Sequence, residues 1–541
     1  MKPFNWHNPY PSLRIPLFAR NVVSTSHPLA AQAGLRMLYQ GGSAVDAAIA
    51  AAAAITLVEP VSCGIGGDAF AIVWDEGKAH GLNASGHAPA AWDLDYFASK
   101  YGRDTQGRPI APKRGVDSVT VPGVVAGWAA LHKKFGKLPF ADLMAPAIEI
   151  AERGYAVPPV VAHKWAAAVP ELKDQPGFAQ AFMPGGKAPV VGQRFSWPAA
   201  AKTLRLIGQT SGKAMYEGEL AHQLVQFLGE HGGAHTLDDF ASYEALWVEP
   251  IAKDYRGYTL HEIPPNGQGI AALMAVGILE HFDLKGLGLD TVASHHLQIE
   301  AMKLAFADLY RYVADARSMT VAAEHLLDPA YLASRAKLIA PARATHFGPG
   351  VPDAGGTIYL SAADESGMMV SFIQSNYMGF GSGVVMPDSG VSLQNRGVGF
   401  SMEADSPNVV AGRKRPFHTI IPAFLSRNGE PVMSFGVMGG DMQPQGHLQT
   451  LVRMLDYDQQ PQAACCAPRW KVNRDFTLDV ESTMAPEVVA GLKKLGHQLK
   501  SVDDPYMDFG SGQFIWRLSG DLEDGYVAAS DSRRDGQAVG F

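Results

Sequence analysis

The chain has 541 residues, of which 47% are hydrophobic and only 18% are charged, and its formal net charge is -8. This composition excludes disordered, collagen-like and coiled-coil proteins, and it allows a large core in three or four domains of about 150 residues or in one α/β body. Because the charge shows no basic excess, we expect no nucleic-acid partner.

The N-terminal end and the cysteines bear on cellular location. The first 21 residues are polar and interrupted by proline, so they lack the continuous apolar core of a secretory signal. The longest uncharged apolar run, residues 47–58, is shorter than the ~20 residues that span a bilayer. Three cysteines, Cys63, Cys465 and Cys466, are too few for a disulfide framework. We therefore expect a cytoplasmic protein without a membrane span.

The first half of the chain is predicted to be mainly helical. Residues 28–39 carry an amphipathic pattern that stops at a Gly-Gly pair. Ser43 can then cap a second helix over residues 44–57, with Asp46 near its positive N-terminus. Further helices are expected at residues 124–135, 143–153 and 292–314.

Three segments of this half could be mistaken for ligand sites. Residues 64–68 are rich in Gly but lack the GK[ST] sequence of a phosphate-binding loop, so they predict a tight turn before a strand at residues 69–74. Residues 230–235, EHGGAH, contain two glycines that spoil a zinc-binding helix. His295-His296 with Glu300 is read as an ordinary helical face. We expect neither a metal nor a cofactor.

The second half of the chain has the pattern of a β protein. Residues 348–356 are rich in Gly and Pro and predict an exposed loop. Strands are expected over residues 357–363, 368–375, 420–427 and 430–436.

The first pair of strands has a register that can be worked out. A three-residue hairpin loop at residues 365–367 places Gly367 where a left-handed residue is needed. Thr357 then lies opposite Ser375, whereas a four-residue loop would place it opposite Gln374.

The second pair has a stronger turn signal. Asn428-Gly429 between two apolar runs is typical of a two-residue hairpin loop. Its register predicts that His418 lies opposite Gly439 and Thr419 opposite Met438. A Gly-Gly step is therefore expected at a strand end beside polar residues.

Thr357 begins a strand directly after a Gly-rich loop, and this position has one special chemical possibility. If the chain is cut before Thr357, its hydroxyl becomes a nucleophile whose base is its own α-amine. The same hydroxyl can make the cut by attacking the carbonyl of Gly356, which has no side chain to hinder the approach. From the residues alone, packing or solvent exposure is the commoner role of a threonine in a strand.

Five segments, in order along nearly the whole chain, carry a resemblance to a known family. They are residues 21–60, 118–157, 262–280, 355–376 and 529–541. They resemble the γ-glutamyltransferase family of N-terminal-nucleophile hydrolases. The resemblance implies a four-layer αββα sandwich of the α/β class. It also implies a proenzyme that cuts itself into a large subunit, residues 1–356, and a small subunit, residues 357–541, which form one interlocked body and could pair as a dimer.

The resemblance implies roles for individual residues. Thr357 falls on the nucleophile, so the cleavage site is Gly356-Thr357, and Ser375 falls on a supporting hydroxyl that is Thr in typical members. Gly439 and Gly440 fall on the paired glycines whose backbone N–H groups form the oxyanion hole. Such donors contribute about 3–4 kcal/mol each in tested enzymes.

The chain departs from the family where the glutamyl group is recognised. The Arg that binds the α-carboxylate aligns with Ser85, and the Asp that binds the α-amine aligns with Gly399. A Ser-Ser pair aligns with His418-Thr419. Losing both charged anchors removes strong charge-assisted hydrogen bonds, so Arg396, His418 and His87 become the candidate anchors for a substrate carboxylate.

The loop near this pocket is also short. Residues 409–414 stand where typical bacterial members carry a longer lid, and an open site admits bulkier substrates and water. We therefore expect a small-molecule amide substrate with a γ-glutamyl or similar small acidic acyl group, and hydrolysis in preference to transfer. One alternative is a non-glutamyl amide such as oxamate or a glutaryl amide of the cephalosporin type. Another is a non-catalytic binding protein that keeps the fold and is never cut.

Overall fold

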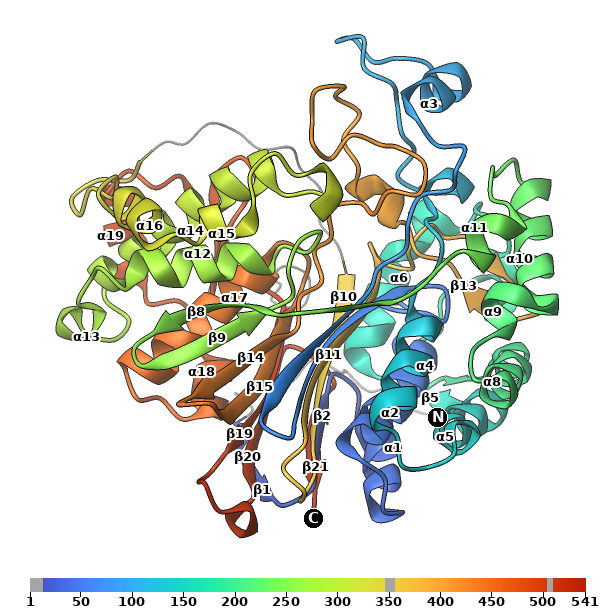
Figure 1. The fold of residues 1–541 in the computed structure, drawn as a ribbon, viewed down its shortest axis with the longest axis horizontal. Helices are drawn as coiled ribbons and strands as arrows, with labels where there is room; N and C mark the ends of the chain where they lie inside the picture. Colours follow the sequence, from blue (N-terminus) through green and yellow to red (C-terminus); the bar gives the residue numbers. More distant parts are fainter. Residues whose placement is uncertain (1–12, 346–355, 504–508) are drawn as a thin grey trace.

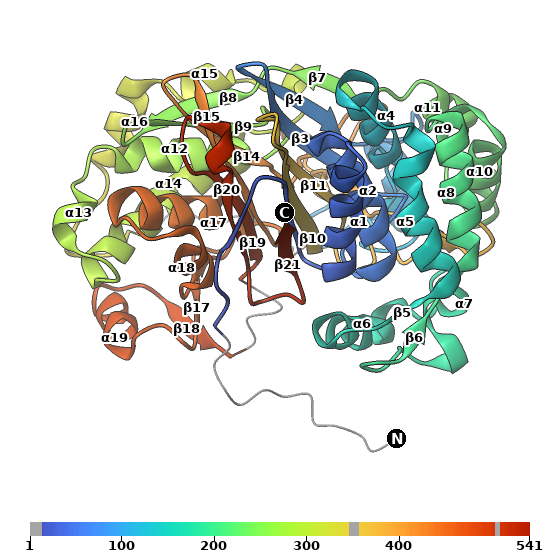
Figure 2. The same cartoon turned by 90° about the horizontal axis from the view of Figure 1, so that it is seen from below.

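The computed structural model describes residues 13–345, 356–503 and 509–541. Within these residues the strands form two large sheets that face each other, with helices on both outer sides (Figure 1). The view from below shows the same layers side by side (Figure 2). The predicted four-layer αββα sandwich is therefore confirmed. The predicted loop over residues 348–356 lies, up to residue 355, outside the described residues.

Antiparallel pairing joins distant parts of the chain in both large sheets. The first sheet has the order β1 (Leu17–Ala19), β20 (Tyr526–Ser530), β19 (Ser511–Arg517), β15 (Glu430–Met438), β14 (Ala423–Arg427), β9 (Tyr258–Glu262), β8 (Ile251–Tyr255). The second has the order β21 (Gln537–Gly540), β2 (Val22–Thr25), β10 (Gly356–Ala363), β11 (Met369–Tyr377), β3 (Asp68–Asp75), β4 (Lys78–Ala84), β7 (Leu246–Val248). Smaller sheets pair β5 (Tyr155–Ala156) with β6 (Arg194–Phe195), β12 (Val385–Met386) with β13 (Val391–Ser392), and β16 (Trp470–Val472), β17 (Leu478–Glu481) and β18 (Leu499–Val502).

Helices cover the outer face of each sheet. The second sheet is covered by α1 (Pro28–Tyr39), α2 (Ala44–Val58) and α4 (Val124–Phe135), backed by α5 (Phe140–Arg153) and α8 (Pro198–Thr210). The first sheet is covered by α12 (Gly269–Leu279), α17 (Met442–Leu451) and α18 (Pro461–Cys466), backed by α14 (Val292–Tyr312). The remaining helices are α3 (Leu94–Tyr101), α6 (Pro159–Leu172), α7 (Phe178–Phe182), α9 (Ala214–Glu217), α10 (Glu219–Glu230), α11 (Leu237–Ala241), α13 (Leu284–Leu287), α15 (Ala323–Leu326), α16 (Pro329–Ala336) and α19 (Pro486–Lys494). No helix in the described part of the chain is both long and apolar enough to cross a membrane.

The helix predictions for the first half are confirmed. Both α1 and α4 have the predicted bounds, and α2 ends one residue later than expected. The capping box is present: Ser43 Oγ accepts the N–H of Asp46 at 3.1 Å, and the Asp46 carboxylate accepts the N–H of Ser43 at 2.9 Å. These bonds satisfy N–H groups that the first turn of a helix otherwise leaves unpaired.

Strand β10 shows how side-chain alternation sorts residues between two cores. Ile358, Leu360 and Ala362 pack toward the helices, whereas Tyr359 and Ala363 lie in the core between the two sheets. Because successive side chains of a strand point to opposite faces, Thr357 belongs to the face that looks toward the first sheet.

The register of the β10–β11 hairpin is confirmed. Residues 358–363 pair with residues 374–369 as predicted, and Gly367 in the loop has a left-handed φ of 92°. A bulge between Gly356 and Ile358 takes Thr357 out of the regular ladder.

The second predicted hairpin is present at Asn428-Gly429, with the expected pairs at its turn end. A bulge between Leu425 and Ser426 then shifts every later pair by one residue. His418 precedes the start of β14 by five residues and forms a bridge with Gly267. The predicted pairing of residues 418–419 with 438–439 is therefore wrong, because the bulge shifts the register and His418 pairs with Gly267 instead. The sequence contains no recognisable signal for the bulge or for the bridge.

Both sheets mix strands from before and after Gly356. In the first sheet β1, β8 and β9 come from the earlier part of the chain, and in the second β2, β3, β4 and β7 do. The C-terminal strand β21 pairs with β2, and the N–H of Phe541 donates to the carbonyl of Asn21 at 3.1 Å.

Candidate active site

Thr357 lies between the sheets, at the start of β10. Its side chain is buried, and its Oγ1 lies 3.3 Å from Ser375 Oγ on β11. Ser375 Oγ also accepts the backbone N–H of Tyr377 at 2.7 Å. The two hydroxyls that the sequence pairs are therefore neighbours despite the bulge, and the backbone holds one of them in place.

Gln443 is a second neighbour of Thr357. Its Nε2 lies 3.4 Å from Thr357 Oγ1, and its Oε1 accepts the N–H of Ile421 at 2.9 Å. The second bond orients the amide, because it fixes which end of the side chain is the acceptor. A donor is thus directed at the Thr357 hydroxyl from helix α17, on the opposite sheet.

Gly439 and Gly440 connect β15 to α17 and lie in the sequence GGDMQ that carries Gln443. Their φ values are 118° and 58°, a left-handed region that favours glycine. The Gly439 carbonyl accepts the N–H of Met442, and the Gly440 carbonyl accepts the N–H of Gln443. Gln268 Nε2 donates to the carbonyls of Gly440 and Thr419, which ties the glycine step to the segment that carries His418.

Arg396 is fully buried, and among the described residues no carboxylate forms an ion pair with it. Its Nη1 donates to Thr419 Oγ1 at 3.0 Å, and its guanidinium lies 4.0 Å from the centre of the Tyr377 ring. Its Nε and Nη2 have no hydrogen-bond partner among the described residues. Burial lowers the pKa of Arg396 to about 10, so the group remains charged at neutral pH.

His418 is held in a fixed, neutral form. Its Nδ1 accepts the N–H of Ile420 at 3.3 Å, so its proton is on Nε2, which donates to Asp68 Oδ2 at 2.9 Å. Both side chains are fully buried. Burial, and then the nearby Arg396 charge, lower the pKa of His418 well below its usual value. A neutral ring with both nitrogens occupied is a poor direct anchor for a substrate carboxylate.

The other predicted recognition residues, Ser85, Thr419 and His87, differ in whether they contact the segment of His418 and Arg396. Ser85 Oγ donates to Asn83 Oδ1 at 2.7 Å and accepts from Asn266 Nδ2 at 3.2 Å, while the N–H of His418 donates to the carbonyl of Asn266. Thr419 touches Arg396 directly. His87 instead bonds the carbonyl of Ala88 at 3.0 Å, and burial lowers its pKa. The contacts of the described residues thus bring Ser85, His418, Thr419 and Arg396 together and leave His87 apart.

A cavity of about 690 Å³ opens beside Gly439 and Asp441. Its far side is formed by the small sheet of β16, β17 and β18, with Asn473 and Lys500 in its lining. The carboxylate of Asp441, one of the lining residues, accepts hydrogen bonds from Arg474 at 2.6 and 3.0 Å. The volume is in the range of small-molecule sites in proteins.

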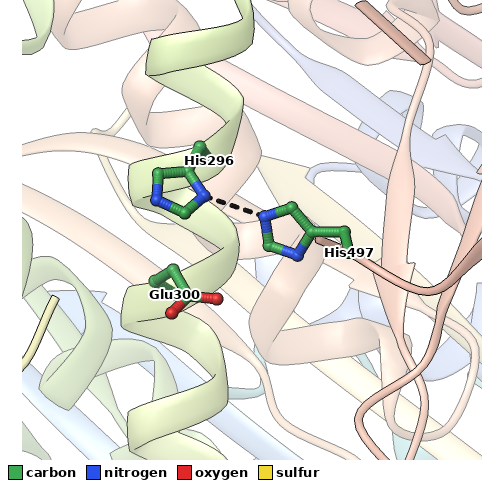
Figure 3. A group of neighbouring side chains, drawn as sticks. All are labelled: His296, Glu300 and His497. Carbon is green, nitrogen blue, oxygen red and sulfur yellow. Dashed lines mark hydrogen bonds between the residues drawn. The ribbon is translucent and has the colours of Figure 1, made fainter. Parts of the chain in front are cut away.

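The histidines considered as metal ligands have other partners. His231 and His235 bond the carbonyls of Phe227 and Val119, respectively. His296 and Glu300 lie near His497, as Figure 3 shows, and their ligand atoms are within 4.8 Å of one another.

This cluster is a hydrogen-bond chain with a cation already in it. His296 Nδ1 lies 2.8 Å from His497 Nε2, and Lys303 Nζ lies 3.2 Å from His497 Nδ1 and 2.9 Å from Glu300 Oε1. At the two ends of this hydrogen-bond series, His296 Nε2 bonds the carbonyl of Ala340, and Glu300 Oε2 accepts the N–H of Thr345. The ammonium group supplies the positive charge that a metal would bring, so this geometry fits a structural anchor.

Sequence reasoning missed Asp68 and Gln443. Asp68 is in the Gly-rich segment interpreted as a turn, and its acceptance of several N–H donors depends on segments that are distant in the chain. Gln443 follows the paired glycines by three residues, which is the spacing that brings a side chain back over the first turn of a helix. That spacing was a usable signal.

The two facing sheets between layers of helices are the fold of N-terminal-nucleophile hydrolases, a class of amidohydrolases and acylases. The sequence model of the gamma-glutamyltranspeptidase family matches residues 30–541, and the chain belongs to that family. A crystal structure of cephalosporin acylase from Bacillus halodurans superposes with a TM-score of 0.94 at 46% identity, covering 100% of this chain and 99% of that one.

Two curated relatives match over nearly their whole length. The oxamate amidohydrolase proenzyme of Klebsiella pneumoniae is 37% identical over 95% of this chain and 97% of its own. A glutathione hydrolase-like proenzyme of Bacillus subtilis is 36% identical over 96% of this chain and 98% of its own. The family expectation drawn from the sequence is thus confirmed.

Proposed function

We propose that the chain is a precursor that cuts itself between Gly356 and Thr357, and that Thr357 then acts as the nucleophile of an amidohydrolase. The observation that carries this proposal is the contact of Thr357 Oγ1 with Ser375 and Gln443 at the start of β10. The proenzyme names of its relatives support the same reading.

The cut needs no outside reagent except water. The Thr357 hydroxyl attacks the Gly356 carbonyl, the C–N bond breaks, and the Thr357 nitrogen takes the proton and becomes a free amine. Water then hydrolyses the resulting ester, so the earlier piece ends in the carboxylate of Gly356 and Thr357 regains its hydroxyl. In turnover, the new amine takes the hydroxyl proton while Oγ1 attacks the substrate amide. The amide C–N bond then breaks, and the amine part leaves with that proton. Water finally hydrolyses the acyl-enzyme.

The glycine step is proposed to stabilise the oxyanion. Gly439 and Gly440 directly follow β15 of the sheet that faces Thr357, and helix α17 begins at Met442, so its positive end adds to backbone N–H groups in that region. Ser375 would position the nucleophile through the contact between the two hydroxyls.

Arg396 points to the acyl group of the substrate. A buried guanidinium with two unpaired donor atoms favours a carboxylate and repels an ammonium group. An acyl group with a free carboxylate and no α-amine, such as glutaryl or the oxalyl group of oxamate, fits this better than γ-glutamyl, which carries both. The cavity beside Gly439 gives room for a bulky amine part, which favours a glutaryl amide over oxamate.

The first experiment asks whether the chain is cut. Intact mass of purified wild type should show two pieces of about 38 and 20 kDa, in proportion to its 57.8 kDa, with the smaller one beginning Thr-Ile-Tyr-Leu. Thr357→Ala should stay whole, and Thr357→Ser should still be cut. A wild type that remains one piece and hydrolyses no amide would favour the non-catalytic binding protein.

The second experiment defines the substrate. Glutaryl amides, γ-glutamyl amides and oxamate, the amide of the oxalyl group, are compared by kcat/KM, with the release of acid and of transfer product measured separately in the presence of an amino-acid acceptor. We expect glutaryl to be preferred and hydrolysis to exceed transfer. A preference for γ-glutamyl would show that the α-amine is accommodated and would contradict the role given to Arg396.

A further inference from the structure

Asp68 ties together the segments that surround Arg396. Its Oδ1 accepts the N–H groups of Gly86 at 2.9 Å and Gly123 at 3.2 Å, and Gln394 Nε2 at 2.9 Å. Its Oδ2 accepts Nε2 of His418 at 2.9 Å. Gln394 is two residues before Arg396, and His418 directly precedes the threonine that Arg396 bonds. Asp68 is thus linked by hydrogen bonds to the two segments that contain Arg396 and its partner Thr419.

Among the charged groups near Arg396, Asp68 is the carboxylate whose negative charge can offset the positive charge of the guanidinium. Burial opposes the charged form of Arg396, and the neighbouring groups that favour it are Tyr377, Asp68 and Asp441, in that order. Asp441, however, is already bound at both oxygens by Arg474. His418 is neutral, so it neither adds nor removes charge.

We propose that Asp68 sets the net charge that the acyl pocket presents to the substrate, and so determines how strongly the enzyme prefers an acyl group that carries a carboxylate. With Asp68 ionised, its charge offsets that of Arg396 and the pocket is close to neutral. With Asp68 protonated, the Arg396 charge is unopposed and an anionic acyl group binds more tightly. The inference rests on the proposed function of Arg396 as the carboxylate anchor.

The surroundings of Asp68 determine the pH at which its carboxyl group gains or loses a proton. Burial raises its pKa to about 7, against the opposing effects of Arg396 and of the hydrogen bonds from Gln394 and the two glycine N–H groups. Tyr216 and Tyr243, which also feel the Asp68 charge, have pKa values raised by burial and stay neutral. Of the groups named around Asp68, only Asp68 itself therefore changes charge between pH 6 and 8.

The test compares two acyl groups of one shape. Glutaryl anilide carries a carboxylate, and glutaramyl anilide carries a neutral carboxamide in its place. The ratio of their kcat/KM values cancels the titration of the Thr357 amine, which affects both equally. In wild type we expect this ratio to fall about fivefold or more from pH 6 to pH 8.5, mainly through KM of the glutaryl compound, a size typical of coupling between two sites.

Asp68→Asn should hold the ratio at its low-pH value throughout, because its pocket is always positive. Asp46→Asn is the matched control. It neutralises another buried Asp that accepts three backbone N–H groups, at the start of α2. It should lower thermal stability and leave the pH dependence of the ratio as in wild type.

The outcomes separate the two proposals. A wild type that shows no preference for glutaryl at any pH would overturn the role of Arg396 itself. A preference that stays constant from pH 6 to 8.5, or an Asp68→Asn variant that keeps the wild-type pH step, would overturn the role of Asp68 alone. The wild-type profile is informative even if the Asp68 variant does not fold.

Discussion

The hydroxyl of Thr357 lies 3.3 Å from that of Ser375, although a bulge has taken Thr357 out of the β10–β11 ladder. A bulge beside a functional residue re-aims a side chain without breaking the sheet. Here it leaves Thr357 on the inter-sheet face, within reach of Gln443 from the other sheet.

Ser375 should support both the cut and the turnover. In Ser375→Ala the Thr357 hydroxyl loses its neighbour, and we expect both rates to fall about 10- to 100-fold, the cost of a hydrogen bond to a group that becomes charged. Ser375→Thr keeps the hydroxyl and should retain most of the rate. The measurement is precursor half-life by intact mass, followed by kcat of the cut enzyme. Equal rates in Ser375→Ala and wild type would contradict this prediction.

Gly439 should not tolerate a side chain. Its φ is 118°, and a Cβ at this position would meet Gly510 Cα at 2.9 Å. We expect Gly439→Ala to reduce the rate of self-cleavage by about 100-fold or more, because a displaced N–H donor no longer meets the oxyanion. Gly429→Ala is the control, since Gly429 has a φ of 80° but open space around it. It should cost about 1 kcal/mol of stability and keep the cleavage rate. If both variants are cut equally fast, Gly439 has no role in the oxyanion hole.

Arg396 should lower the thermal stability of the protein while it contributes to binding of the substrate carboxylate. Arg396→Met removes a buried charge that forms no ion pair with a carboxylate in the described part of the chain, so we expect the melting temperature to rise. The same change should lower kcat/KM for a glutaryl amide about 100-fold, the order of one charge-assisted contact, and leave the glutaramyl amide within about threefold. Scanning calorimetry and kinetics on one preparation provide both numbers. A lower melting temperature would mean that Arg396 is chiefly structural.

Glu262 and His447 form a second buried pair, with His447 Nδ1 2.7 Å from Glu262 Oε1. Burial raises the pKa of Glu262 well above its usual value and lowers that of His447 to about 3. Folding therefore favours the neutral form of each. The Glu262 contribution to stability is present at low pH and is lost as the pH rises through its raised pKa. The His447 contribution is present above about pH 6.5 and is lost as the pH falls toward 3.

Glu262→Gln isolates one half of this behaviour. The amide keeps the shape and cannot ionise, so we expect the melting temperature of the variant to exceed that of wild type by an amount that grows from pH 5 to pH 9. Loss of stability in acid should remain, because His447 is unchanged. A difference that shrinks as the pH rises would show that Glu262 is ionised in the folded protein.

Local patterns in the sequence were enough for much of the fold. The Ser43–Asp46 capping box, the loop at Gly367 and the turn at Asn428-Gly429 depend only on neighbouring residues, and each is present. The juxtaposition of Thr357 and Ser375 followed from the first of these hairpins. Family resemblance then supplied the layers, which local patterns alone did not define.

The parts that sequence reasoning missed depend on distant contacts. The bulge at Leu425 and the bridge from His418 to Gly267 are set by how β14 meets β9 and the segment after it. The residues that neighbour Asp68 in the sequence indicate only a turn. It becomes a central acceptor because residues 86, 123, 394 and 418 converge on it in space. No short window of sequence contains that information.

The mixing of early and late strands in both sheets has a consequence for how such a chain could be made and kept. Neither part could form a closed hydrophobic body alone, because each would expose strand edges that the other covers. We therefore expect the two parts to assemble while they are still joined across Gly356, and that link to become dispensable once both sheets are complete. A cut at that position would leave two polypeptides that separate only when the whole protein unfolds. The peptide bond before Thr357 could therefore be broken to create the catalytic amine without destabilising the folded protein.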